Sequence, residues 1–285
     1  MTNKQIIEKM SKDMEMRGFS KWTKESYLSK TKDIIKYFNK PMEKVRIEEL
    51  REFLLKYLRE ERRLSERSVN YYNSVIRFMY EVTMDKIINK KQLPMYRNRR
   101  KMKDVLTKEE LSTFFNACDN YMYKTIFMMI YGSGLRISEA VNLRVEDIDS
   151  RKMRIFVREG KGRKERYTVL SETSLEMLRK YYKMYNPRHP EGYIFLNKDG
   201  NPLKVERTRV FFRRYRRKAK IDKKFVVHSL RHSFATDLIE RGATILEVKE
   251  LMGHSNIRST MEYIHVAKLE LKVNNPLDEL MKGVK

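Results

Sequence analysis

"MRIFVREGKGRKERYTVL", residues 153–170, is the one clear β signal in a chain whose other patterns are helical. Two runs rich in β-branched and aromatic residues, MRIFV and ERYTVL, flank a Gly-Lys-Gly turn. Such runs on both sides of a glycine turn are typical of a β-hairpin. The sequence therefore predicts a mainly α-helical fold with a small β-sheet or hairpin.

Helical signals lie on both sides of this hairpin. A helix capped near Thr107 begins the second half of the chain, and another covers about 120–131 until GSG, residues 132–134, breaks it. A third helix begins within LRISEAVNLRVEDI, residues 135–148, and helices again follow the hairpin. We expect residues 105–285 to form one mostly helical domain.

The N-terminal third reads as a separate domain of four helices. Tyr27, Ile34, Ile35 and Phe38 have the i, i+7, i+8, i+11 spacing of one helical face, and Ser65 is a plausible N-cap. The four segments expected to be helical are about 3–17, 22–40, 47–63 and 65–83. We expect residues 1–90 to form a compact helical domain.

Between the two domains lies a basic stretch without a periodic face. Pro94 breaks regular structure, and the residues after it are nearly all basic. We interpret 91–104 as an interdomain linker that can lie along phosphates, although a solvated surface loop would look the same. The cations expected to contact phosphates from this linker are Arg97, Arg99, Arg100, Lys101 and Lys103.

The charge of the chain points to a polyanionic partner. The formal net charge is +25, of which residues 1–100 contribute +11 from 25 Lys and Arg against 14 Asp and Glu. A membrane surface is the rival polyanion, but the longest apolar run, 125–135, is too short to span a bilayer, and the N-terminus has no signal-peptide core. The single cysteine, Cys118, fits a reducing cytosol. We expect a cytoplasmic protein that binds nucleic acid.

"HSLRH", residues 228–232, allows three interpretations. His228 and His232 have the i, i+4 spacing of a zinc pair, but a third ligand and a glutamate base are missing nearby. His228 and Arg231 share a helical face and combine a proton-transfer group with a fork of donors, which suits a phosphodiester. Taken alone, the segment also fits a surface helix with scattered polar groups.

Three further motifs decide between these interpretations. GSGLRISEAVNLRVEDID supplies Arg136, GKGR supplies Lys161, and LMGHSNIRSTMEYIH supplies His254 and Tyr263. With HSLRH they resemble the tyrosine recombinase (phage integrase) family, whose motif runs Arg, Lys, His-x-x-Arg, His or Trp, Tyr in this order. The resemblance is strong over 105–270, and it extends to the N-terminal domain, a DNA-binding domain in the family, by architecture only.

The resemblance implies a role for each motif residue. Arg136 and Arg231 would neutralise charge on the phosphate oxygens, because guanidinium groups stay protonated at any working pH. Tyr263 would be the nucleophile that forms a 3′-phosphotyrosyl link, and Lys161 would protonate the departing 5′-oxygen. The supporting roles fall to His228 in proton transfer, His254 as a phosphate donor and Glu139 in orienting the site.

Some neighbouring residues are less distinctive. Lys164 lies on the same hairpin and is the alternative to Lys161; with Arg163 it is expected to contact DNA. His232 and His265 match the family pattern, yet we expect both to be structural. No Walker-type phosphate loop and no carboxylate cluster for magnesium occurs in the sequence, so we expect strand exchange without ATP, metal or another cofactor.

The resemblance also implies an assembly and two rival activities. The family works as a homotetramer on two DNA sites, and the tail, about 266–285, would dock on a neighbouring subunit rather than on its own chain. The two-domain layout suggests an Xer-type or Cre-type recombinase, serving either dimer resolution or a mobile element. The alternatives are a non-catalytic architectural DNA-binding protein, which would lack one of the arginines, and a monomeric topoisomerase of type IB.

Overall fold

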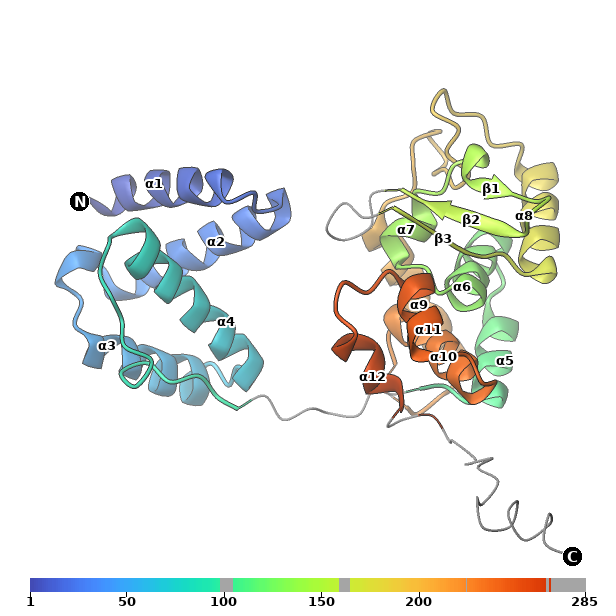
Figure 1. Ribbon diagram of the computed structural model, residues 1–285. Coiled ribbons are helices and arrows are strands. Elements are labelled where there is room, and N and C mark those ends of the chain that lie inside the picture. Colours follow the sequence, from blue (N-terminus) through green and yellow to red (C-terminus); the bar gives the residue numbers. More distant parts are fainter. Residues whose placement is uncertain (98–104, 159–164, 224, 265–266, 268–285) are drawn as a thin grey trace, which may run out of the picture. The chain divides into compact units, whose positions relative to one another are not determined.

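Helices make up most of the chain, which divides into two units, Met1–Arg100 and Lys101–Lys285. The computed structural model describes residues 1–97, 105–158, 165–223, 225–264 and 267 (Figure 1). Each unit has its own hydrophobic core, and a small three-stranded antiparallel sheet lies in the second. The predicted fold class, mainly helical with a small sheet, is confirmed.

The first unit contains the four predicted helices, and its last two continue as π-helical turns. Its elements are α1 (Asn3–Met16), α2 (Lys21–Phe38), η1 (Met42–Lys44), α3 (Ile47–Glu52) with η2 (Phe53–Glu61), and α4 (Glu66–Arg77) with η3 (Phe78–Thr83). Ser65 caps α4 as predicted, because its side chain accepts a hydrogen bond from the Ser68 amide. The helix predicted over 22–40 ends earlier, at Phe38, where Asn39 adopts a left-handed conformation.

The second unit surrounds its sheet with helices. The helices are α5 (Lys108–Ala117), α6 (Tyr121–Ser133), α7 (Ile137–Val141), η4 (Val145–Asp147), α8 (Glu172–Tyr185), α9 (Val205–Lys218), α10 (Val227–Glu240), α11 (Ile245–Met252) and α12 (Arg258–Ile264). The strands are β1 (Ile148–Asp149), β2 (Arg154–Val157) and β3 (Arg166–Val169), in the order β1-β2-β3. Thr107 caps α5 with a capping box, as the sequence predicted.

The predicted hairpin is present as β2 and β3. Ile155 pairs with Thr168 and Val157 with Arg166, and the buried side chains Ile155, Val157 and Thr168 face the core. The predicted Gly-Lys-Gly turn, 160–162, lies outside the described residues. Strand β1 was not predicted, because two residues are too few to show a period.

Two boundaries near the hairpin differ from the prediction. Helix α6 continues through Gly132 and Ser133 and ends only at Gly134, whose φ of 62° is left-handed. The helix expected within 135–148 is short and ends at Val141, since the chain then turns into η4 and β1.

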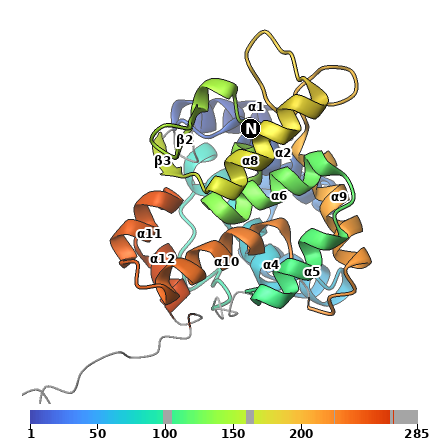
Figure 2. The ribbon, with the colours of Figure 1, turned by 90° about the vertical axis from the view of Figure 1, so that its right-hand side faces the viewer.

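Helix α6 is the centre of the second unit. It is apolar on nearly all sides, which is typical of a fully buried helix, and Phe127, Met129 and Ile130 are completely buried in the core. Helix α10 lies beside α6 (Figures 1 and 2), and a smaller apolar cluster joins α10 to α11 and α12. In the described parts of the chain, we find no helix long and apolar enough to cross a membrane.

Candidate active site

Arg136 and Glu139 lie at the start of α7, directly after the glycine turn. Glu139 accepts hydrogen bonds from the Arg136 amide at 2.8 Å and from Arg136 Nη1 at 2.6 Å, so the carboxylate both caps the helix and holds the guanidinium. The turn before α7 packs closely against α10 and needs glycine at 134, because a Cβ there would lie 2.4 Å from the Phe234 ring. The family resemblance implies that Glu139 orients the site, and this role stays a prediction.

Arg231 comes from the buried face of α10. Its side chain donates to the carbonyl oxygens of Gly134, at 2.5 Å, and Met252, and it lies 3.6 Å from Glu139. Arg136 and Arg231 are thus brought to the same carboxylate, from segments 95 residues apart. Burial, followed by the positive charge of Arg136, lowers the pKa of Arg231 to about 9, so the group stays protonated at neutral pH. Its Nε is buried without a hydrogen-bond partner among the described residues.

A third arginine, Arg166, enters the same site, and the sequence analysis missed it. Its Nη1 and Nη2 donate to both Glu139 oxygens at 3.0 and 2.8 Å, and its side chain is only 8% exposed. Burial alone would raise the pKa of Glu139, but the hydrogen bonds and charge of Arg166, then of Arg136, outweigh it and lower that pKa to about 2. Glu139 is therefore ionised throughout the physiological range.

Tyr263 lies on α12 and is almost fully buried, 1% exposed. Its hydroxyl is 2.8 Å from His232 Nδ1, and its ring stacks on His254 with centroids 6.1 Å apart. Burial raises the pKa of Tyr263 to about 12, although the positive charge of Arg231 opposes this. The hydroxyl is a phenol at neutral pH and must lose its proton to become a nucleophile.

The histidines of the predicted motifs differ in their surroundings. His232, expected to be structural, contacts the Tyr263 hydroxyl, whereas His228 is exposed and its ring lies 4.5 Å from the His232 ring. The i, i+4 spacing on α10 is what brings these two rings together. His254 Nδ1 pairs with Thr260 Oγ1 at 2.9 Å. Among the described residues, no group of three or more His, Cys, Asp or Glu could hold a metal.

Several predicted residues fall outside the described part of the chain. These are Lys161, Arg163 and Lys164 at the hairpin, Arg99, Arg100, Lys101 and Lys103 in the linker, and His265 with the tail. Arg97 is described and exposed. Of the predicted residues that are described, Arg136, Glu139, Arg231, His254 and Tyr263 lie close together, and His228 lies beside them next to His232.

Comparison with known proteins follows the same division of the chain. Residues 104–270 match the phage integrase family, and residues 6–90 match its N-terminal SAM-like domain. The chain is a tyrosine recombinase of the phage integrase family. Enzymes of this family break and rejoin DNA strands.

Two curated relatives of the recombinase align along most of its length. A putative integrase/recombinase, y4qK, of Sinorhizobium fredii is 32% identical over 92% of this chain and 84% of its own. The tyrosine recombinase XerA of Pyrococcus horikoshii is 31% identical over 95% and 93% of the two chains. A lambda integrase from a tetramer bound to a Holliday junction shares the fold, with a TM-score of 0.76 and 18% identity over 96% of this chain and 80% of that one.

Helix α9 gives the recombinase a basic face that the sequence analysis did not single out. Its buried positions, Thr208, Phe212 and Tyr215, are spaced i, i+4, i+7, which turns the cations between them to the surface. The exposed cations of this face are Arg207, Arg209, Arg213, Arg214, Arg217 and Lys218. The signal was available in RTRVFFRRYRRK, residues 207–218, but in so basic a chain it did not stand out.

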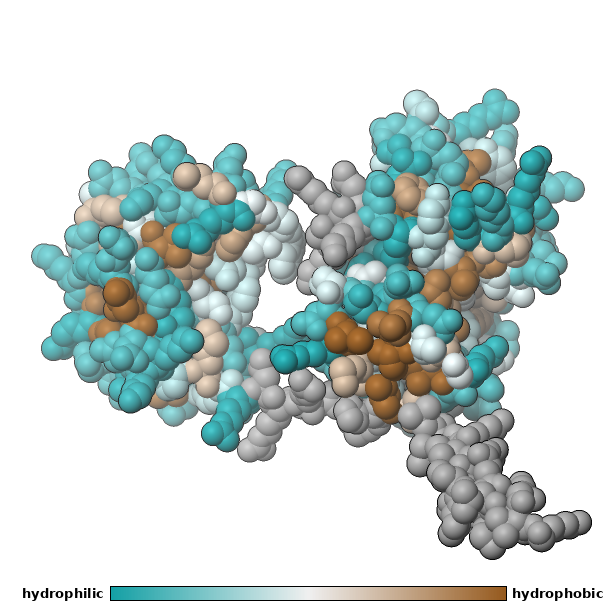
Figure 3. All heavy atoms as spheres, viewed as in Figure 1, coloured by the Kyte–Doolittle hydropathy of each residue, from teal (hydrophilic) through white to brown (hydrophobic). Residues whose placement is uncertain are grey.

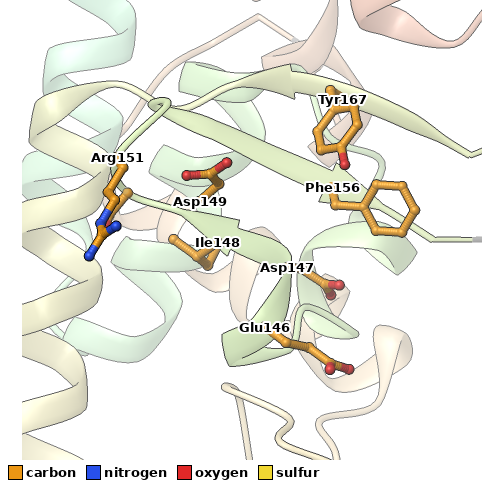
Figure 4. Close-up of a pocket in the computed structure, with 8 residues that line it drawn as sticks. Glu146, Asp147, Ile148, Asp149, Arg151, Phe156 and Tyr167 are labelled. Carbon is orange, nitrogen blue, oxygen red and sulfur yellow. The ribbon is translucent and has the colours of Figure 1, made fainter.

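A pocket of about 450 Å³ on the outer side of the sheet contains none of the predicted site residues. Figure 4 shows Glu146, Asp147 and Asp149 on its rim, with the Phe156 and Tyr167 rings beside them. Carboxylates repel a phosphodiester backbone, so this pocket is a poor place for DNA in the recombinase.

Proposed function

We propose that this recombinase cleaves a specific DNA site by attack of Tyr263 on a phosphodiester, which leaves a 3′-phosphotyrosyl link. The observation that carries the proposal is the hydrogen bond of the Tyr263 hydroxyl to His232, beside the arginines that share Glu139. A tyrosine ester conserves the energy of the phosphodiester, so a 5′-hydroxyl can reverse the step and rejoin the strand.

The two arginines stabilise the pentacovalent phosphate. Extra negative charge develops on the non-bridging oxygens, and Arg136 and Arg231 are fixed in place before the substrate arrives. Fixed donors cost no reorganisation during the reaction, which is why this arrangement favours the transition state over the ground state. His254, next to Tyr263, donates to the same phosphate.

Each proton that moves during cleavage has a donor and an acceptor. The bond between Tyr263 Oη and phosphorus forms while the bond from phosphorus to the 5′-oxygen breaks. His232 accepts the phenolic proton, with His228 next to it as a second proton carrier toward solvent. The 5′-oxygen takes its proton from Lys161, the role that the family resemblance implies. No step in this scheme requires a metal ion or ATP.

DNA contacts come from basic surfaces on each unit. In the second unit we assign them to the exposed face of α9, together with Arg163 and Lys164. In the first unit, a hollow of about 580 Å³ is lined by Lys30, Arg62 and Arg67. We expect the linker cations, Arg97 among them, to lie along DNA phosphates.

The recombinase would act as a homotetramer that joins two DNA sites. Figure 3 shows apolar side chains gathered over α11 and α12, where Leu246, Ile257 and Met261 are exposed. A patch of this kind is typical of a surface that a partner covers, and we assign it to a neighbouring subunit whose tail, about 266–285, is exchanged. The related lambda integrase structure is a tetramer on a Holliday junction.

For the cellular role we favour integration or excision of a mobile element over Xer-type dimer resolution, because the NNPLDEL tail is unlike that expected of a housekeeping Xer protein. Amplification across the ends of the DNA segment that carries this gene should detect an excised circle with wild type and none with Tyr263→Phe. A bound site that lies in the chromosome, without an excised circle, would support dimer resolution instead.

Trapping of the covalent intermediate tests the chemistry. The wild-type protein is used to select its site from a pool of random duplexes, and the selected duplex is nicked so that cleavage becomes irreversible. In EDTA, wild type should form a slow band on a denaturing gel and Tyr263→Phe should bind without forming it. Tight binding without an adduct would favour the architectural protein, an adduct lost in EDTA would revive a metal site, and relaxation of plasmid DNA by a monomer without site preference would favour the topoisomerase.

A further inference from the structure

The end of α11 binds three arginines through its backbone. The carbonyl oxygens of three consecutive residues each accept a hydrogen bond from a different arginine: Leu251 from Arg166, Met252 from Arg231 and Gly253 from Arg136. The C-terminal carbonyls of a helix lack intrahelical partners and carry partial negative charge, so they suit guanidinium groups.

Glu139 lies within ion-pair distance of the same three arginines. The shortest nitrogen–oxygen distances are 2.6 Å to Arg136, 2.8 Å to Arg166 and 3.6 Å to Arg231. One carboxylate therefore organises three cations, and the group keeps a surplus of two positive charges. A surplus of positive charge next to Tyr263 is what a phosphodiester in its transition state needs.

Arg166 differs from the other two arginines in how it uses its nitrogens. Its Nε, Nη1 and Nη2 all donate inside the protein, to Leu251 and to both oxygens of Glu139. Arg231, in contrast, has a buried Nε without a partner among the described residues. Each of the three nitrogens of Arg166 thus has a partner inside the protein, so it is suited to hold the site rather than to bind the phosphate.

Two local features fix Arg166 in this position. It opens strand β3, where it pairs with Val157 on β2, so its backbone belongs to the stem of the hairpin that carries Lys161. Its side chain passes over Gly253, where a Cβ would lie 2.7 Å from Arg166 Cδ. Glycine at 253 therefore lets the guanidinium reach the end of α11.

We propose that Arg166 is a positioning residue of the active site. By binding both oxygens of Glu139 and the Leu251 carbonyl, it ties the hairpin stem to the end of α11. This contact keeps Glu139 from neutralising Arg136 and Arg231 and keeps His254 next to Tyr263. The inference rests on the proposed cleavage by Tyr263.

Loss of Arg166 would change both charge and geometry. Glu139 would then be shared by Arg136 and Arg231 alone, and the surplus of positive charge would fall from two to one. Among the described residues, these two arginines and Arg166 are the charged groups that pair with Glu139. The titratable groups on the end of α11 and on α12, with the segment that follows α11, are Lys249, Glu250, His254, Glu262 and Tyr263. The carboxylate would also become easier to protonate, which makes cleavage sensitive to acid.

The test compares Arg166→Gln with Arg154→Gln on the selected, nicked duplex. Arg154 lies on the same hairpin and also pairs with a carboxylate, Asp149 at 3.1 Å, but outside the site. At saturating protein, Arg166→Gln should slow adduct formation by about 10- to 100-fold while its dissociation constant for the duplex stays within about twofold. The acid limb of its rate–pH profile should move to higher pH, and Arg154→Gln should change neither.

A second variant covers the case in which Arg166→Gln does not fold. Arg166→Lys keeps the charge but loses the two-pronged contact, so it should fold and show an intermediate rate. A wild-type rate and pH profile in both variants would overturn the inference, as would a loss of DNA binding parallel to the loss of rate. If wild type itself forms no adduct, the proposed function fails, and that outcome is distinct.

Discussion

The hydroxyl of Tyr263 lies 2.8 Å from Nδ1 of His232, one turn of α10 beyond His228. In the proposed mechanism, this contact gives the first proton transfer to His232, which the sequence led us to expect as a structural residue, buried or hydrogen-bonded. It also separates two histidines that the motif HSLRH presents as equivalent. The difference between them can be measured.

His232→Gln should slow cleavage more than His228→Gln does. Loss of a positioned proton acceptor typically lowers the reaction rate by about 10²-fold or more. His228 does not contact the Tyr263 hydroxyl in this scheme and only receives the proton from His232, so its loss should cost less. Single-turnover adduct formation on the nicked duplex measures both rates. Equal losses, or a larger loss in His228→Gln, would return the role to His228.

Arg231→Lys should lose cleavage while keeping DNA affinity. Lysine preserves the charge but cannot donate to Gly134, Met252 and a phosphate from one planar group, so we expect a loss of about 10²-fold in rate. The dependence of the binding constant on salt should stay the same, since the number of cations is unchanged. A loss of DNA affinity as large as the loss of rate would show that Arg231 acts as a general phosphate contact instead.

The basic face of α9 should carry part of the salt dependence of binding. Changing Arg207, Arg213 and Arg214 together to Gln removes three exposed cations, and the slope of log K against log salt should fall by about 2 to 3. The matched control changes Arg179, Lys180 and Lys183, which are exposed on α8. If both triple variants change the slope equally, α9 has no special contact with DNA.

Glu139 should stabilise the fold at neutral pH and lose this effect in acid. Its pKa is about 2 in the folded chain and near 4.5 when unfolded, so its contribution is complete above about pH 4.5 and is lost as the pH falls toward 2. The shift corresponds to roughly 3 kcal/mol of unfolding free energy. Glu139→Gln should therefore show a flatter pH dependence of the unfolding free energy than wild type between about pH 5 and 3. Parallel curves for the two proteins would contradict the ion-pair geometry.

Gly134→Ala should destabilise the second unit more than Gly192→Ala. Both glycines have left-handed φ angles, 62° and 71°, but a Cβ at 134 meets the Phe234 ring at 2.4 Å while one at 192 meets nothing within 4 Å. We expect a loss of about 2 to 4 kcal/mol at 134 and about 1 kcal/mol at 192. Denaturant unfolding of the two variants isolates the contribution of the contact with Phe234.

The motif residues could be identified from the sequence, because each one lies in a recognisable local pattern that does not depend on tertiary structure. Arg136 follows a glycine turn, and Tyr263 follows a threonine in T-M-E-Y-I-H. The hairpin and the cap at Thr107 were predictable for the same reason. Short-range chemistry determined all of these features.

Arg166 and His232 were not predictable in this way. In GRKERY, Arg166 is one cation among several, and only the approach of α11 distinguishes it from its neighbours. The role of His232 depends on where α12 places Tyr263, which local spacing does not encode. Strand β1 exists only because β2 lies beside it. Long-range packing decides all three.

The arginines at the end of α11 are held by main-chain oxygens, and this determines which positions near the site can change in sequence. An acceptor that belongs to the backbone survives any replacement of the side chain it is attached to, provided that the helix keeps its path. Leu251 and Met252 can therefore vary with their packing partners while the arginine acceptors persist. Gly253 has no such freedom, because its missing side chain makes room for Arg166. In a mutational scan, tolerance should therefore drop sharply between positions 252 and 253.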